Sequence, residues 1–185
     1  MRAVLLLTTC TLIAGPAVDP AVLVRAKIHQ IESGKARPGA IFTFSAKDLN
    51  AYARSELPLI APEGVRQPRL ELGSGTASAY ALINFLRLRQ SQGSATPWLI
   101  AKLIEGERPV KVEARIQSKG GRATVYLERV EISGLAVTGS TLDFLVSTFF
   151  QPLFPNAKIN EAFELSDRVD RIEVTPTQAR VLIRK

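Results

Sequence analysis

The chain has 185 residues and a mass of 20.2 kDa, with 46% hydrophobic and 22% charged residues. This length favours one domain with a substantial core, and the composition excludes wholesale disorder, collagen and a disulfide scaffold. The 24 Lys and Arg residues against 17 Asp and Glu residues give a net charge of +7, while one His, one Cys and one Met leave little material for metal, thiol or histidine chemistry.

The N-terminus has the pattern of a secretory signal peptide. Arg2 precedes an apolar run that ends at Ala14, and small residues suited to cleavage follow up to Ala17. The run is too short to cross a membrane, which needs about 20 apolar residues. We therefore expect residues 1–17 to be a signal peptide and residues 18–185 to be one exported domain, periplasmic or secreted. Retention of the signal would instead leave the domain associated with the membrane.

The lone cysteine, Cys10, lies inside that segment, so the mature domain would contain no thiol, which suits an oxidising compartment. A lipidated cysteine is the alternative, but Thr9 stands where a lipobox normally has Gly, Ala or Ser. Cleavage would remove only Arg2 among the charged side chains, so the basic charge belongs to the mature domain. The basic residues form no run and do not alternate with stacking aromatics, so the sequence predicts no nucleic-acid partner. An anionic membrane surface is a partner that this charge would suit.

The first third of the mature chain is predicted to form two helices and a strand. Residues 20–33 carry apolar side chains at helical spacing, and residues 40–44 read as a short strand. Ser45 and Asp48 then have the spacing of a capping box, so a second helix is expected to begin there. Pro58 and Pro62 are expected to close it.

Farther along the chain, the apolar side chains alternate, which is typical of strands. We expect a strand at 69–72, a turn, and a long strand at 76–88 that has to twist or curl. Strands at 110–116 and 123–127 are predicted to pair as a hairpin around Gly120-Gly121.

The same hairpin requires an irregularity. The alternation changes phase between Leu127 and Val130, so a bulge near Glu128-Arg129 is expected to keep both apolar side chains on one face. A last hairpin is predicted from residues 172–174 and 179–183.

Two segments between the strands are apolar nearly all round. Residues 97–105 follow Thr96 and begin with a proline, which is a favourable start for a helix. Residues 141–151 follow Ser140, which together with Asp143 can cap a helix. Helices of this kind need cover on more than one side. Either they pack against the sheet and another helix, or they line a cavity for an apolar ligand.

Motifs for catalysis are missing from the sequence. It contains no Gly-x-Ser-x-Gly elbow, no His-Glu-x-x-His pair, no cysteine pair and no phosphate-binding Gly-rich loop. Carboxylates are present, but their spacing brings no two of them together as an acid–base pair. We therefore predict a non-enzymatic protein with no catalytic residues, no metal site and no cofactor.

Two short motifs and the order of elements carry a family resemblance. Ser45-x-x-Asp-Leu-Asn50 begins a helix, and Glu131-Ile-Ser-Gly-Leu135 precedes a helix and two last strands. Over residues 40–185 this order resembles the small bacterial exported relatives of the tubular lipid-binding (TULIP-like) superfamily, although the helix at 141–151 is short for that fold. The resemblance implies an α+β fold, in which a long, strongly curved antiparallel sheet of about six to seven strands wraps around one or two apolar helices. It also implies a phospholipid-like ligand in the channel between them.

The sequence therefore predicts an exported protein that binds or carries a lipid or other apolar small molecule. The expected apolar lining comes from the two all-round apolar segments: Trp98, Leu99, Leu103, Phe144, Phe149 and Phe150. The alternative is an envelope interaction module without a ligand channel, whose apolar helix packs on a protein partner or on the membrane surface.

Overall fold

The computed structural model describes residues 19–61, 64–90, 105–155, 158–166 and 168–185. The helices are α1 (Pro20–Glu32), α2 (Ala46–Ile60), α3 (Phe85–Gln90) and α5 (Gly139–Leu145), which continues as the π-helix η1 (Val146–Phe150). The strands are β1 (Ile41–Ser45), β2 (Val65–Leu72), β3 (Thr76–Asn84), β4 (Glu107–Lys119), β5 (Arg122–Ile132), β6 (Leu135–Ala136), β7 (Ala162–Glu164), β8 (Val169–Val174) and β9 (Gln178–Ile183).

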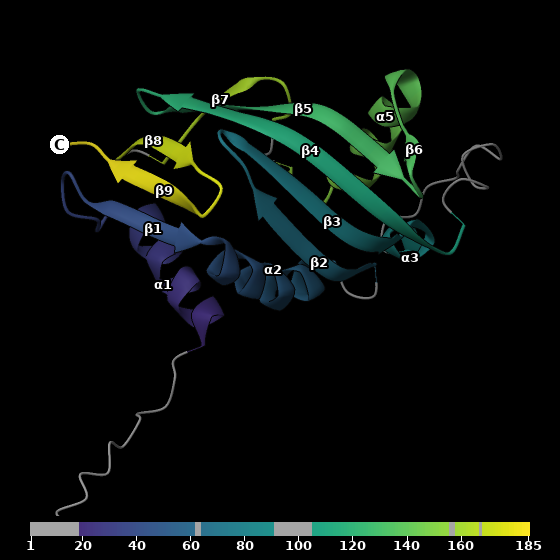
Figure 1. Ribbon diagram of the computed structural model, residues 1–185, viewed down its shortest axis with the longest axis horizontal. Helices are drawn as coiled ribbons and strands as arrows, with labels where there is room; N and C mark the ends of the chain where they lie inside the picture. Colours follow the sequence, from purple (N-terminus) through teal and green to yellow (C-terminus); the bar gives the residue numbers. More distant parts are fainter. Residues whose placement is uncertain (1–18, 62–63, 91–104, 156–157, 167) are drawn as a thin grey trace, which may run out of the picture.

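The strands form two antiparallel sheets (Figure 1). Sheet A has the order β1-β9-β8, and sheet B has the order β2-β3-β4-β5-β6, with β7 paired to the free edge of β5. The predicted α+β class and antiparallel pairing are confirmed. The expectation of one sheet was wrong, because β9 pairs with β1 from the other end of the chain rather than with a strand of sheet B.

The N-terminal elements form as local signals predict. The backbone N–H of Asp48 donates to Ser45 Oγ at 3.1 Å and that of Ser45 donates to Asp48 Oδ2 at 3.4 Å, so the capping box is present. Of the two prolines expected to close this helix, Pro58 lies inside it, and the helix ends at Ile60, two residues before Pro62 in the sequence. A proline this close to the C-terminus of a helix costs only one backbone hydrogen bond.

The long strand predicted at 76–88 is shorter. β3 ends at Asn84, whose side-chain oxygen accepts a hydrogen bond from the backbone N–H of Arg87 at 3.1 Å and so caps α3. Phe85 and Leu88 lie three residues apart, which places them on one face of a helix, and both are buried. The strand therefore ends here, because a helix buries both side chains on the same side.

Both details predicted for the β4–β5 hairpin are confirmed. Gly120 and Gly121 have φ angles of 60° and 82°, as a two-residue turn with two left-handed positions requires. Glu113 pairs with Arg129 while Ala114 pairs with Leu127, so Glu128 is the bulged residue.

The helix predicted at 141–151 is present but starts earlier and ends differently. α5 begins at Gly139 after Thr138, and no side chain caps it, so the cap predicted from Ser140 and Asp143 was wrong. Its last turn widens into η1, which turns Phe149 into the interior. Of the helix predicted at 97–105, residues 97–104 lie outside the described residues, and Glu105 is exposed and not helical.

Two separate hydrophobic cores occupy opposite ends of the molecule. The first core joins α3, α5 and η1 to the inner face of sheet B; its larger buried members are Phe85, Leu88, Val110, Ile132, Leu145 and Phe149. The second core lies between α1, α2 and sheet A; its larger buried members are Val24, Ile31, Phe44, Val169 and Ile183. Among the described residues, the second core contains no buried side chain from sheet B.

Strand β8 runs across the tips of the sheet B hairpins and joins the two sheets. The Ser118 hydroxyl donates to the carbonyl oxygen of Ile172 and accepts from its N–H, both at 2.7 Å. The N–H groups of Gly75 and Gly121 donate to the carbonyl oxygens of Val174 and Asp170 at 2.9 and 2.6 Å. We call this row of bonds the seam.

The seam predicts a stability loss on removal of one hydroxyl. Ser118→Ala leaves the N–H and the carbonyl of Ile172 without their partner, so the free energy of unfolding should fall by about 1–3 kcal/mol. Ser78→Ala in neighbouring β3 is the matched control, and it should change that free energy by less than about 0.5 kcal/mol. Urea unfolding followed by circular dichroism measures both variants, and equal losses would contradict a specific role for Ser118.

Candidate functional site

The candidate site is an apolar stretch on the inner face of sheet B, the face that packs against the first core. The register places these apolar side chains side by side from strand to strand. We call this surface the trough; it comprises Leu70 and Leu72 of β2, Ala77 and Ala79 of β3, Ala114 and Ile116 of β4, and Val125 and Leu127 of β5.

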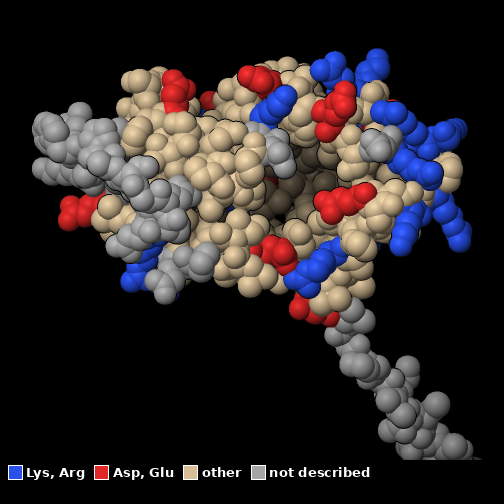
Figure 2. Space-filling model, turned by 180° about the vertical axis from the view of Figure 1, so that it is seen from behind, with Lys and Arg blue, Asp and Glu red and all other residues tan. Residues whose placement is uncertain are grey.

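The trough lies between the two cores and belongs to neither. None of its eight side chains is fully buried, and Ala79 near its centre is exposed. Seen from behind, the molecule is hollowed on this side (Figure 2). At about 4.8 Å between neighbouring strands, the four strands span about 14 Å. The inner face of this sheet is thus covered at one end by the first core and left open in the middle.

Small residues produce the opening. Ala77, Ala79 and Ala114 occupy positions where larger apolar side chains would fill the space above the sheet. The alternating pattern was recognised in the sequence, but these alanines were not predicted as a site. A sequence signal for such an opening is a strand in which every second residue is alanine and the residues opposite on the next strand are large.

Of the predicted lining residues, one is buried, two are half-buried and three lie outside the described residues. Phe149 is buried in the first core, with its ring centroid 5.1 Å from that of Phe85 in an edge-to-face arrangement. Phe144 is half-buried and packs edge-to-face on Phe149 at 6.3 Å. Phe150 is half-buried and contacts Phe154, with ring centroids 5.0 Å apart. Trp98, Leu99 and Leu103 lie outside the described residues.

The Ser-x-x-Asp-Leu-Asn motif has a structural explanation. Asn50 extends from α2 to the edge of β2, where its amide nitrogen donates to the Leu70 carbonyl at 2.7 Å and its oxygen accepts from the Leu70 N–H at 2.8 Å. At the other edge, the Asn160 side-chain oxygen accepts from the Leu127 N–H at 2.9 Å, and the Asn160 backbone N–H donates to the Val125 carbonyl at 2.9 Å. Both asparagines therefore cap sheet edges on either side of the trough.

The outer face of sheet B is polar and its charges pair with one another. Lys111 and Glu113 form an ion pair at 2.5 Å, and this hydrogen bond lowers the pKa of the Glu113 carboxyl and raises the pKa of Lys111. The Arg69 guanidinium lies 4.2 Å from the centroid of the Tyr80 ring, and the Tyr80 hydroxyl donates to Glu71 at 2.9 Å. Arg69, Tyr80 and Lys111 from these pairs line a shallow depression of about 690 Å³. Because the groups of each pair satisfy one another, we do not assign a ligand to this face.

Charge pairing also joins the two N-terminal helices. Arg25 of α1 hydrogen-bonds to Glu56 of α2, which raises the pKa of Arg25. Burial raises the pKa of the neighbouring Tyr52, with a further contribution from Glu56. These contacts hold α1 against α2 beside the second core.

Comparisons with known proteins add no family assignment. A scan against protein-family models finds no match, and a search of the curated proteins finds no similar sequence. Among the described residues, no helix is long and apolar enough to cross a membrane, and no group of three or more His, Cys, Asp or Glu side chains is placed to hold a metal ion.

The two neighbouring phenylalanines of η1 should differ in their contribution to stability. Phe149→Ala removes a buried ring from the first core, so the free energy of unfolding should fall by about 3–5 kcal/mol. Phe150→Ala, the matched control, removes a half-buried ring and should cost about 1–2 kcal/mol. Chemical denaturation of both variants tests the difference, which would be absent if Phe149 faced an open channel.

Proposed function

We propose that this chain is an exported, non-enzymatic protein that binds or carries a lipid or another apolar ligand in the trough. The observation that carries the proposal is the run of eight apolar side chains on the inner face of sheet B, none of them fully buried, between two cores that are themselves well packed. Apolar side chains gain about 25 cal/mol for each Å² removed from water. An acyl chain laid across the strands would supply that cover.

The shape of the trough favours a long, thin ligand. It extends across four strands and is lined by small and branched aliphatic side chains, without a charged group among them. The ion pairs of sheet B lie on the opposite face. Sites of this composition suit lipid-like molecules, whose polar group can remain at the rim. In this proposal sheet B curves around the ligand, and the half-buried Phe144 and Phe150 contribute to the lining. Trp98, Leu99 and Leu103 stay lining residues predicted from the sequence alone.

Blocking the trough should release the ligand. In Ala79→Trp the indole fills the centre of the trough, which should displace about two methylene groups of the ligand and lower its affinity about tenfold. Ser78→Trp is the matched control, because the adjacent side chain points to the outer face of the same strand. Lipid extracted from each purified, detergent-free protein is quantified by mass spectrometry.

Three outcomes of that experiment are informative. Stoichiometric lipid in the wild type and in Ser78→Trp, with much less in Ala79→Trp, supports the trough. Equal lipid in all three proteins places the ligand elsewhere. A wild-type protein that stays free of lipid after incubation with envelope lipids overturns the proposal.

Export supplies a separate test. If residues 1–17 are a cleaved signal, protein recovered from the periplasm should begin at Val18 and should lack Cys10. Intact-mass measurement of the recovered protein checks this, and a full-length mass in the cytosolic fraction would contradict export.

A second candidate is the envelope interaction module. The observation that favours it is the exposure of large apolar side chains away from the trough, among them Leu59 at 74% and Leu135 at 63%. A protein partner or a second copy of the chain would cover such residues. Light scattering and crosslinking in envelope extracts separate the candidates, because a carrier without a protein partner should remain monomeric.

A further inference from the structure

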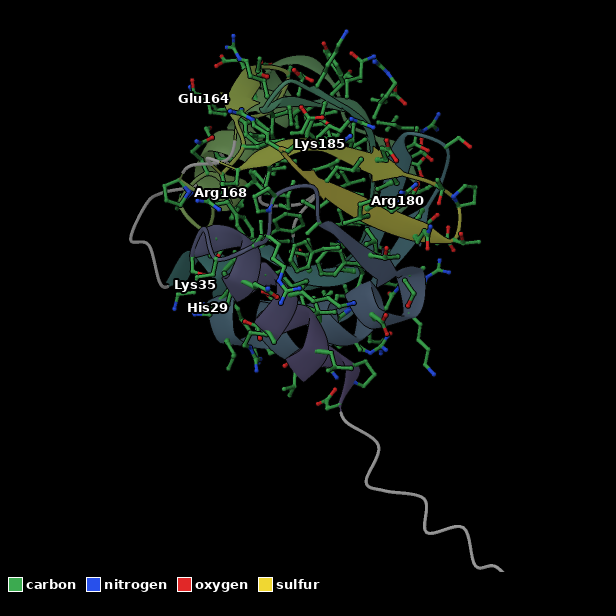
Figure 3. All side chains as sticks on the ribbon, turned by 90° about the vertical axis from the view of Figure 1, so that its left-hand side faces the viewer. His29, Lys35, Glu164, Arg168, Arg180 and Lys185 are labelled. Carbon is green, nitrogen blue, oxygen red and sulfur yellow. The ribbon has the colours of Figure 1, made fainter. Side chains whose placement is uncertain are left out.

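One end of the molecule carries a cluster of basic side chains. Lys and Arg residues gather there in the space-filling view (Figure 2), and Lys35, Arg168 and Lys185 are labelled in the view onto this end (Figure 3). We call this surface the basic end; it comprises Lys35, Arg37, Lys119, Arg168, Arg184 and Lys185.

Backbone bonds bring these residues together from four parts of the chain. The Gly39 N–H donates to the Arg184 carbonyl at 2.9 Å, and the Arg184 N–H donates to the Arg168 carbonyl at 2.8 Å. These bonds join the loop after α1, the end of β9 and the loop before β8. The Arg184 side chain also lies over Gly121, where a Cβ atom would stand 1.7 Å from its Nη2 atom. The β4–β5 turn, with Lys119, is therefore held against the same end.

The basic end differs from the other charged surfaces in its lack of counter-charges. On the outer face of sheet B, basic residues pair with carboxylates, as Arg69 does with Glu71 and Arg115 with Glu128. None of the six residues of the basic end forms an ion pair with a carboxylate in the described part of the chain. Glu164, across the strand from Arg122, is the acidic side chain labelled on this view (Figure 3).

The chemistry of the basic end fits an anionic surface rather than a nucleic-acid groove. All six side chains are exposed and come from loops, turns and strand ends, so no single helix presents them together to a groove. None of the cation–aromatic contacts in the described residues involves them, so no stacking platform for bases accompanies the charge. Long, unpaired Lys and Arg side chains suit mobile lipid phosphates, which adapt to the protein.

We propose that the basic end docks the protein onto a bilayer rich in anionic phospholipid. The hollow seen in Figure 2 lies beside this end, so docking would bring the trough close to the membrane surface. The docking depends on charge at the basic end and not on a ligand in the trough. It therefore stands or fails independently of the carrier function.

The test removes three charges from the basic end. Lys35→Gln, Lys119→Gln and Lys185→Gln are combined, because these exposed side chains make no hydrogen bond within the described chain. Each lysine near an anionic surface contributes about fivefold to partitioning, so the triple variant should bind on the order of 100-fold more weakly. The control combines Lys47→Gln, Arg54→Gln and Arg66→Gln, which removes the same charge from exposed positions on α2 and β2.

Binding is measured by co-sedimentation with vesicles of phosphatidylcholine alone or with phosphatidylglycerol. We expect the wild type and the control triple to bind the phosphatidylglycerol vesicles within about fivefold of one another and to be released by salt. Lipid carried in the trough is extracted from the same proteins and should be unchanged in the basic-end triple. Loss of that lipid would assign the lysines to the trough and overturn docking as a separate property.

Three further outcomes would overturn the proposal. If both triple variants lose vesicle binding to the same extent, the vesicles attract the net charge of the protein and not the basic end. Absence of wild-type binding to phosphatidylglycerol vesicles would exclude an anionic bilayer as partner. Binding of the wild type to single-stranded DNA through the same three lysines, without binding to vesicles, would assign the surface to nucleic acid.

Discussion

The hydrogen bonds between Ser118 and Ile172, together with those between Asn50 and Leu70, join the two halves of this molecule. The bonds of Ser118 attach β8 across the tips of the sheet B hairpins, so that sheet A and the two N-terminal helices form a second, separate core beyond the end of sheet B. If β8 instead lay flat on the inner face, its side chains would cover the trough. The seam thus fixes the distance between the cores, and the middle of the sheet stays open because of it.

The same seam accounts for the position of the basic end. β8 and β9 bring Arg168 and Arg184 to the tip of the β4–β5 hairpin, where Gly121 donates to the Asp170 carbonyl. Gly121 fulfils two requirements at once, since its φ angle of 82° closes the turn and its missing Cβ leaves room for the Arg184 guanidinium. Charge gathers where strand ends meet, and the apolar face lies along the strands between that end and the first core.

Local chemistry was predictable from the sequence, and long-range pairing was not. The capping box of Ser45 and Asp48, the Gly120-Gly121 turn and the bulge at Glu128 each depend on residues a few positions apart. The pairing of Ile41 with Leu182 joins opposite ends of the chain, and no periodicity indicates it. The apolar pattern of residues 85–88 is compatible with a strand and with a helix. The helix forms because it buries both Phe85 and Leu88 in the first core. The trough was missed for a related reason: alanine alternates like any strand residue, and only its neighbours show that it leaves space.

Two asparagine side chains protect the edges of sheet B, and this limits the kinds of molecule that can bind there. An exposed strand edge attracts another strand through free backbone groups. Asn50 occupies the N–H and the carbonyl of Leu70 on β2, and Asn160 occupies the N–H of Leu127 on β5; both leucines belong to the trough. A partner chain cannot add a strand at these points without displacing an asparagine. The apolar face between them remains accessible, and a ligand that needs no backbone hydrogen bonds can use it. An acyl chain meets that condition and an added polypeptide strand does not, so the protected edges are compatible with the proposed lipid ligand and disfavour a partner that binds by adding a strand at these points.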